Sequence, residues 1–497
     1  MSRRGIYFFV DLKVNTTDMA LPGNLSYFLS RMQGVSTNYF KTFPNNTGTA
    51  TPSKILRFEL PSNSLLNLRS LQLMFSASTT GATAGGRLPN KIDSLIERYA
   101  LYAGGVLVSH GYNQYNVLRH AKDVLQGDKC SSVTGHPECV RTVSYVDGGG
   151  NGAVPPAAIT GTNNEAYSSA GDRTQFCVDY WDSFLGTCHP SILDTSILPQ
   201  LVLEITLADA SVLGSVAGIA LDGTGATDIT DDGTGAASFT MDNIHLNCEV
   251  LGLASSVLDE ITARRMQDVG YVELPFKQYF HYPDTHTGTS RFSVSTQSLD
   301  RIWMVYRDGT AYATQGGLVR VAGYKESGAF TSTASIANTT AAGAVTQDVG
   351  KPSYDIGGSA CTNQEKYQTK FFKFEETRAA ANTPATYQLQ INSSSIPQFK
   401  ANEVEMYAIS KNSVDNYDTE HCMTLDQYRN NYFVQCVRFC MPDSDFGRMI
   451  SGLDTRSVSA ACSLVTEGLA NTTRLDVFCE CHSSLRIGPG KAIEVVV

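Results

Sequence analysis

Charged residues are scarce in this sequence. They make up 17% of the chain, against about 25% in an average soluble protein. The 48 Asp and Glu residues outnumber the 38 Lys and Arg residues, which gives a net charge of −10. A protein with a net negative charge is poorly suited to binding the phosphates of DNA or RNA over most of its surface. We therefore expect no sequence-specific nucleic-acid partner, and the only basic tip is Arg3-Arg4.

Long hydrophobic runs are also missing. No stretch approaches the roughly 18 apolar residues of a membrane span. The apolar run at residues 6–10 is too short, and wrongly flanked, for the core of a signal peptide. We expect no transmembrane segment and a protein that is made inside the cell.

Cysteines are too few for a disulfide-stapled secreted module, with 12 in 497 residues. Five lie in apolar or alternating runs, where a free cysteine packs as a small hydrophobe; these are Cys177, Cys248, Cys436, Cys479 and Cys481. Cys130 and Cys139 lie instead in a polar stretch with Gly, Ser and Pro. Two interpretations stay open there, a loop disulfide or two unpaired thiols.

Motifs of common enzymes and metal sites are absent. The sequence contains no phosphate-binding Gly-x-x-x-x-Gly-Lys motif, no Gly-x-Ser-x-Gly and no His-Glu-x-x-His. The groups Cys436-x-x-x-Cys440 and Cys479-x-Cys481-His482 match no common zinc spacing, which favours buried thiols. The sequence therefore predicts no catalytic residue, no metal site and no cofactor.

What is present favours β-structure. The chain has 42 Gly, 23 Tyr and 22 Phe but only 2 Trp, and short alternating runs are separated by turn residues. Strands are predicted at 54–60 and 71–75 and, in the second half, at 271–276, 291–294, 301–306, 371–374, 387–391, 403–409, 432–439, 474–481 and 493–497. Helical spacing occurs at 115–125 and 256–267. Stretches 148–170, 223–237 and 327–348 are rich in small residues, which indicates surface insertions.

Three short segments recur in the same order in both halves of the chain. Residues 58–65 match residues 292–299 at an offset of 234. Residues 177–180 and 191–196 match 436–439 and 451–456 at offsets of 259 and 260. The growing offset is what an insertion in one half would produce. These matches indicate two copies of one β-domain, and the strand number and long connections suit a jelly-roll sandwich.

Two consecutive jelly rolls joined by a helix resemble the double jelly-roll major capsid proteins of icosahedral double-stranded DNA viruses. The resemblance is strongest from Gln435 to Val497, with Leu453-Asp454-Thr455 and the closing strands, and it is most like polinton-like virus and virophage capsid proteins. The expected architecture is all-β: an N-terminal arm at 1–50, a first jelly roll at 51–254, a linker helix at 255–270 and a second jelly roll at 271–497.

The resemblance implies a homotrimer whose capsomers tile a virion shell, with neighbouring capsomers, penton and minor capsid proteins as partners. Assembly would take place inside the infected cell. The arm carries the basic tip Arg3 and Arg4 and the small apolar patch Tyr27, Phe28 and Leu29, which we expect to tie neighbouring capsomers together. A β-sandwich adhesin or glycan-binding spike, and an enzyme on a β-scaffold, remain alternatives. Oligomer mass and electron microscopy of a closed shell would separate them.

Overall fold

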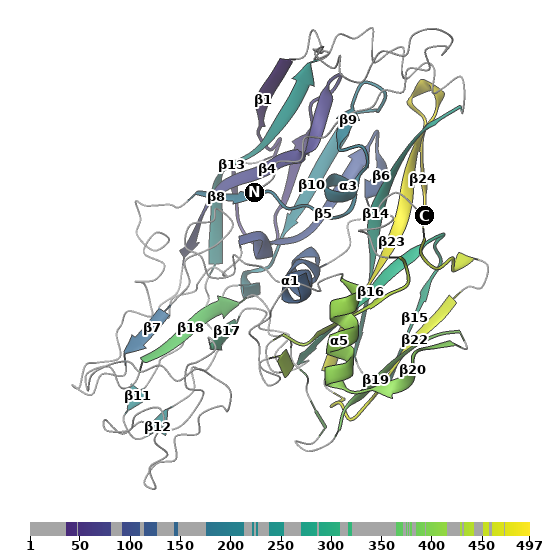
Figure 1. Cartoon of the computed structure of the whole chain (residues 1–497). Helices are drawn as coiled ribbons and strands as arrows, with labels where there is room; N and C mark the ends of the chain where they lie inside the picture. The colour runs from purple at the N-terminus through teal and green to yellow at the C-terminus, as the bar shows by residue number, and fades with distance from the viewer. Residues whose placement is uncertain are drawn as a thin grey trace, which may run out of the picture.

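The computed structural model of the chain describes residues 36–46, 48–80, 92–109, 114–126, 144–147, 175–212, 221–222, 225–226, 238–252, 270–285, 288–308, 317–320, 364–370, 374, 376, 378–379, 384–392, 394–414, 428–429, 432–441, 451–456, 460–471 and 473–497. Most of these residues lie in two antiparallel β-sandwiches that follow one another along the chain (Figure 1). Among the described helices, none is long and apolar enough to cross a membrane.

The first sandwich consists of sheets A and B. Sheet A contains, in spatial order, β1 (Ser36–Thr42), β13 (Ser238–Gly252), β4 (Leu65–Thr80) and β8 (Gln175–Val178), with β2 (Thr49–Ala50) beside β13 and β9 (Ile192–Asp194) beside β4. Sheet B contains β3 (Ile55–Glu59), β10 (Leu201–Leu207), β5 (Ile96–Ala103) and β6 (Val106–Ser109). The helices are η1 (Ile92–Leu95), α1 (Tyr115–Gln126), α3 (Ser183–Thr187) and η4 (Ala210–Val212).

The second sandwich consists of sheets C and D. Sheet C contains β14 (Val272–Thr285), β23 (Thr473–Ile487), β16 (Leu299–Asp308) and β21 (Val434–Arg438), with β24 (Ile493–Val496) beside β23. Sheet D contains β15 (Thr289–Val294), β22 (Ala460–Glu467), β19 (Thr386–Ile391) and β20 (Ser394–Ala401). The helices are α5 (Glu403–Ser413) and η7 (Pro489–Lys491).

Insertions from both halves share one small sheet outside the sandwiches. There, β18 (Gln364–Lys370) pairs with β17 (Gly317–Arg320) on one side and with β7 (Ser144–Asp147) on the other. A separate hairpin is formed by β11 (Leu221–Asp222) and β12 (Gly225–Ala226). Figure 1 shows these elements together at the lower left. The predicted insertions at 148–170 and 327–348 lie outside the described residues, as does nearly all of 223–237.

The strands form because apolar and polar residues alternate along them. In β10, every second residue from Leu201 to Leu207 is buried, and β15 shows the same period with Phe292 and Val294 inside. Successive side chains of a strand point to opposite faces. This period therefore gives each sheet one apolar face, and the two apolar faces of a sandwich pack into its core.

The two sandwiches have the same spatial order of strands. The strands β1, β13, β4 and β8 correspond to β14, β23, β16 and β21, and β3, β10, β5 and β6 correspond to β15, β22, β19 and β20. Helix α1 lies between β6 and β8 along the chain, as α5 lies between β20 and β21. The matched phenylalanines Phe58 and Phe292 lie in β3 and β15, and Cys177 and Cys436 lie in β8 and β21. The predicted repeat is therefore present in the structure.

The repeated Leu-Asp-Thr segments make the same contacts in both sandwiches. Thr195 Oγ1 accepts a hydrogen bond from Ser64 N at 3.0 Å and donates to Ser64 O at 2.9 Å. Thr455 Oγ1 accepts from Thr296 N at 3.0 Å and donates to Thr296 O at 3.2 Å. In each segment the preceding aspartate accepts from the backbone N–H two residues further on. The motif thus fastens its own segment to the residues just before β4 in the first sandwich and just before β16 in the second.

Some sequence expectations need correction. The change in offset is the net result of insertions in both halves, because residues 127–174 extend the first half and residues 309–385 extend the second. Residues 403–409 form a helix, not a strand, because Asn402 and Glu405 make a capping box at its start. Residues 36–42 and 49–50 pair with β13 and belong to sheet A, although the sequence placed them in the arm.

The predicted helix at 115–125 is confirmed by α1. The predicted linker helix at 256–267 and residues 1–35 lie outside the described residues. The division of the chain at 255–270 therefore stays a prediction.

Candidate functional site: the contact between the two sandwiches

Sheet C presents one face to sheet D and the other to the first sandwich. Along β16, Ile302 and Met304 pack in the core of the second sandwich, whereas Trp303 and Val305 join the hydrophobic cluster of the first. Because consecutive residues of a strand point to opposite faces, Arg301 shares the face of Trp303. This face of sheet C carries the polar groups of the contact.

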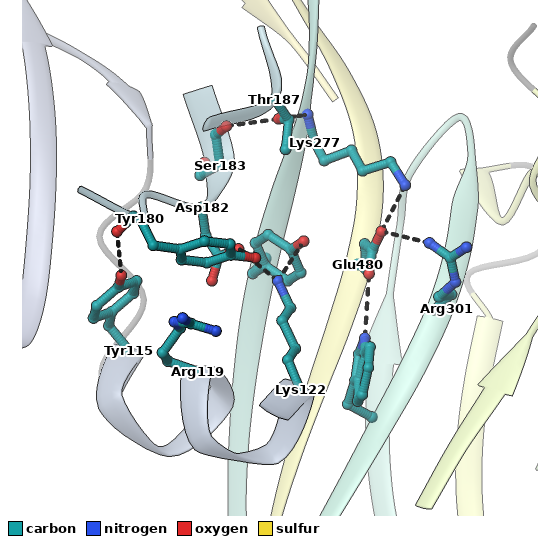
Figure 2. A network of polar contacts seen from close by, with 12 residues as sticks. Tyr115, Arg119, Lys122, Tyr180, Asp182, Ser183, Thr187, Lys277, Arg301 and Glu480 are labelled. Carbon is teal, nitrogen blue, oxygen red and sulfur yellow. Dashed lines mark hydrogen bonds and ion pairs between the residues drawn. The ribbon is translucent and has the colours of Figure 1, made fainter. Parts of the chain in front are cut away.

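Glu480 of β23 lies at the centre of this face (Figure 2). Its Oε1 accepts from Lys277 Nζ at 2.8 Å and from Arg301 Nη1 at 3.0 Å, and its Oε2 accepts from Trp303 Nε1 at 3.2 Å. Arg301 also donates from Nε to Ser413 O at 2.9 Å. A buried carboxylate needs such partners in place of water, and here both of its oxygens have them.

Lys122 of α1 connects the first sandwich to the second. Its Nζ is 2.6 Å from Asp182 Oδ1 and 2.8 Å from the hydroxyl of Tyr279, which belongs to β14. Tyr180 also donates to Asp182 Oδ1, at 3.1 Å, and Tyr115 donates to the carbonyl of Tyr180 at 2.9 Å. Figure 2 shows this chain of contacts running from α1 toward Glu480. Lys122 and Asp182 are both buried, so they form a desolvated ion pair.

The charges around Glu480 determine its ionisation. Burial alone would raise the pKa of Glu480, but the positive charges of Lys277, Arg301 and Lys122 outweigh burial and hold the pKa well below its usual range. Glu480 is therefore ionised at neutral pH. It is the anion that Lys277 and Arg301 contact directly, while the charge of Lys122 acts on it from further away.

The pKa of Asp300 is shifted in the opposite direction, upward. Burial raises its pKa to about 6, and the negative charge of Glu480 adds to that rise, while Lys277 and a hydrogen bond from Ser298 oppose it. Ser298 Oγ donates to Asp300 Oδ1 at 2.9 Å, and Lys277 Nζ lies 3.9 Å from the other carboxylate oxygen. Asp300 is thus the member of this group whose protonation changes near pH 6.

A second polar link joins the sandwiches further along sheet C. Arg307 donates from Nε to Asp476 Oδ2 at 3.0 Å and from Nη2 to Gln114 Oε1, in the first sandwich, at 2.8 Å. His281 Nε2 lies 2.9 Å from the other oxygen of Asp476. Burial would raise the pKa of Asp476, but Arg307 and His281 together hold it well below its usual range.

Helix α3 and the residues after it close the free edge of β14. Phe184 packs edge-to-face on Phe276, with ring centroids 5.2 Å apart. The backbone N–H of His189 donates to a carbonyl of β14 at 3.0 Å, and Thr187 Oγ1 accepts from the backbone N–H of Lys277 at 2.8 Å. The edge of sheet C is therefore covered by the first sandwich of the same chain.

A cavity of about 880 Å³ lies beside this contact. Both sandwiches line it, and charged side chains from both are present, among them Arg69, Lys122, Asp182, Glu273, Lys277, Arg301 and Glu480. All three acids in this set already accept hydrogen bonds from neighbouring side chains.

The fold has counterparts among solved structures. A chain of the quasi-atomic model of the PBCV-1 virus capsid is 13% identical, with a TM-score of 0.51 over 95% of this chain and 99% of that chain. PBCV-1 VP54, fitted into a reconstruction of the virophage Sputnik, is 13% identical with a TM-score of 0.50 over the same shares. The Faustovirus major capsid protein is 10% identical, with a TM-score of 0.50 over 94% of this chain and 92% of that chain.

This chain is a double jelly roll. The match extends over both sandwiches, and the identical strand orders in the two halves agree with it. The predicted all-β fold with two consecutive jelly-roll sandwiches is confirmed. No protein-family model and no curated protein matches the sequence.

The polar contact between the two sandwiches of this double jelly roll is structural, and we call it the joint. It is built around Lys122, Asp182, Lys277, Arg301 and Glu480. Its cations and acids are paired with one another, and the thiol of Cys436 on the same face has a pKa raised by burial, which makes it a poor nucleophile. Within the described ranges, no three His, Cys, Asp or Glu side chains are grouped so as to hold a metal ion. The arrangement fixes the two jelly rolls relative to each other.

The sequence-predicted residues are only partly described. The arm residues Arg3, Arg4, Tyr27, Phe28 and Leu29 and the pair Cys130 and Cys139 lie outside the described residues. The predicted buried thiols Cys177, Cys248, Cys436, Cys479 and Cys481 are all buried, and none of them forms a disulfide. Cys436 lies in one hydrophobic cluster and Cys479 and Cys481 in the other, which separates the groups considered as zinc ligands.

The residues of the joint were missed from the sequence. Lys277, Arg301 and Glu480 each interrupt an apolar strand with a charge, and that interruption is the signal that could have singled them out. Residues that meet in the joint are far apart along the chain: Lys122 and Tyr279 are 157 positions apart. Spacing alone could not have brought them together.

Proposed function

We propose that this double jelly roll is a major capsid protein that forms homotrimers and that these trimers tile a closed virion shell. The observation that carries the proposal is the extent of the match. It spans 95% of this chain and 99% of a chain of the PBCV-1 virus capsid, and it includes both sandwiches. One fold can serve many functions. A structural match that covers two consecutive jelly rolls in the same order is nevertheless more specific evidence than a match to a single jelly roll.

The joint between the sandwiches supports a structural role. A shell subunit must keep its two jelly rolls in a fixed relation, and buried ion pairs hold groups in one geometry more strictly than apolar contacts do. Glu480, with three donors on its two oxygens, fits that need. In this proposal the protein is not an enzyme, it is located in the virion, and penton and minor capsid proteins are its further partners.

Mass and shape test the proposal together. Light scattering of the purified full-length protein should give three times 53.8 kDa at micromolar concentration, and negative-stain microscopy of concentrated protein or of virions should show closed shells. A clean monomer that forms no shells would refute the proposal. Defined oligomers that bind glycans and never close into shells would favour a spike or adhesin instead.

The arm is a second test of the same proposal. Deleting residues 1–35 removes Arg3, Arg4 and the patch at Tyr27, Phe28 and Leu29, but leaves β1 in place. We expect trimers to persist while shells fail to form, because the arm would join capsomers and not subunits. A matched control replaces the same residues with a Gly/Ser-rich segment of equal length. Loss of the trimer or of the fold on deletion would contradict this assignment.

A further inference from the structure

The cavity beside the joint has the size and the position of a ligand site. Its volume of about 880 Å³ is typical of small-molecule sites, which often lie between two domains. Sheet C supplies one wall and the first sandwich supplies the other; Figure 2 shows Lys122 and Asp182 on one side and Lys277 and Glu480 on the other. Aromatic side chains are mixed with the charged groups of the lining, namely Tyr180, Trp181, Phe276, Tyr279 and Trp303. The cavity therefore suits a molecule with a charged part and an apolar part.

The charges of the lining favour an anion over a cation. The permanently charged lining residues are Arg69, Lys122, Lys277 and Arg301 against Asp182, Glu273 and Glu480. The excess is positive, although the whole chain has a net charge of −10. Each of these acids already has donors; Glu273, for example, accepts from Ser484 Oγ at 2.8 Å and from Arg486 Nε at 3.2 Å. A local positive field of this kind attracts negatively charged ligands.

Arg69 is the cation in excess. Within the part of the chain that the structure describes, its guanidinium has no hydrogen-bond or ion-pair partner, and neither has the imidazole of His189. Both side chains line the cavity, and both residues are exposed, so they lie where the cavity opens to water. A guanidinium binds a phosphate group through two parallel N–H donors, and an imidazole can add a third. The free donors of the lining are therefore those that an oxyanion needs.

A β-bulge holds Arg69 at the cavity. Residues 68–71 of β4 lie opposite the single residue Cys248 of β13, and a bulge of this kind turns side chains away from the regular ladder. Three hydrogen bonds fix the bulge: Leu68 N to Ser191 O at 2.9 Å, Glu249 N to Ser70 Oγ at 2.8 Å and Trp181 Nε1 to Leu71 O at 2.9 Å. The backbone that carries the guanidinium is thus ordered before a ligand arrives, which lowers the entropic cost of binding.

His189 lies against the second sandwich. Its backbone N–H donates to the carbonyl of Pro275 in β14 at 3.0 Å. Lys277, two residues further along β14, is on the same face of the strand as Pro275 and also lines the cavity. A ligand held by Arg69 and His189 would therefore contact both sandwiches.

We infer that this cavity binds a small organic phosphate, whose phosphate group is held by Arg69 and His189 and whose apolar part lies against the aromatic side chains. A phosphate monoester carries close to two negative charges at pH 7, so it gains more from the positive lining than a singly charged anion does. The inference goes beyond the proposed function and does not depend on it. A ligand that contacts both sandwiches stabilises the folded chain by mass action.

Titration of the full-length protein with phenyl phosphate tests the inference. Both tryptophans of the chain line the cavity, so tryptophan fluorescence should change saturably, and calorimetry should give one site per chain. Arg69→Gln removes a side chain without a described partner, so circular dichroism should be unchanged. The substitution should raise the dissociation constant at least about tenfold at low, fixed ionic strength, because it removes charge-assisted hydrogen bonds.

Arg291→Gln is the matched control, because Arg291 is also an exposed arginine on a strand, in β15, and does not line the cavity. It should leave the dissociation constant unchanged. Phenol, which has the same ring without the phosphate, should bind at least about tenfold more weakly.

Three results would each overturn the inference: no saturable binding of phenyl phosphate to the wild type, wild-type affinity in Arg69→Gln, or equal affinity for phenol. The oligomer mass and the shells are measured without this ligand. Failure of the inferred site therefore leaves the proposed function intact, and a wild-type monomer that forms no shells leaves the inferred site intact.

Discussion

Replacing Glu480 by Gln tests the joint at its central anion. The change keeps the size of the side chain but removes the negative charge that lies 2.8 Å from Lys277 Nζ and 3.0 Å from Arg301 Nη1. Arg301 is buried, and the substitution removes the carboxylate with which it forms an ion pair. Removing one partner of a buried ion pair costs about 3–5 kcal/mol.

We expect the free energy of unfolding at pH 7 to fall by about that amount, or two to four orders of magnitude in the folding equilibrium constant. Gln can still accept from Trp303 Nε1, whose present bond to Glu480 Oε2 is 3.2 Å, so the loss is electrostatic. The same substitution should lower the pKa of Asp300, because Glu480 is one of the charges that raise it.

Urea denaturation at a fixed protein concentration, followed by tryptophan fluorescence, measures the effect. The two tryptophans report on separate sandwiches, since Trp181 donates to Leu71 O in the first and Trp303 contacts Glu480 in the second. Glu467→Gln is the control, because that carboxylate pairs with Lys400 in an exposed position, and it should leave the midpoint unchanged. A Glu480→Gln midpoint equal to that of the wild type, with the same slope, would refute the reasoning.

Two further predictions concern single side chains. A carboxyl whose pKa is raised by folding to about 6 binds a proton that the unfolded chain has already released, so the wild type should lose about 2 kcal/mol of stability between pH 4 and pH 6. Asp300→Asn should remove this loss, and urea midpoints across that range would show whether the two profiles differ. Thr195→Val removes the acceptor of the part-buried Ser64 N–H, and Thr455→Val removes the acceptor of the buried Thr296 N–H, at up to about 1–3 kcal/mol each. Their effects on thermal melts should add, since they lie in different sandwiches, and a silent variant would count against the fastening role.

Much of the fold follows from local pattern. Alternating apolar and polar residues made β3 and β15 recognisable. The repeated Phe58 and Cys177 segments revealed the duplication, because equivalent positions in two sandwiches face the same packing demands. The segment at 403–409 was misassigned for a local reason. Its residues alternate well enough for a strand, but Asn402 satisfies the backbone N–H groups of Val404 and Glu405 and so starts a helix.

The joint could not be predicted in the same way. Glu480 is ionised and buried only because Lys277 and Arg301, about 200 and 180 residues earlier in the chain, lie beside it in sheet C. In the sequence it is an ordinary acid in a strand. Local pattern fixes which side chains face inward, but the contact between two domains depends on pairings over the whole chain.

The strand order of sheet C sets the order in which the chain can fold during synthesis. Its central strand, β23, pairs with β14, β16 and β24, yet it is nearly the last strand to be made. The first sandwich, whose own central strand β13 ends at Gly252, can close while the second is still being translated. Until β23 emerges, β14 and β16 have exposed edges and no common partner, which are the conditions that favour aggregation. Chaperone binding to nascent chains should therefore peak between completion of β16 and emergence of β23.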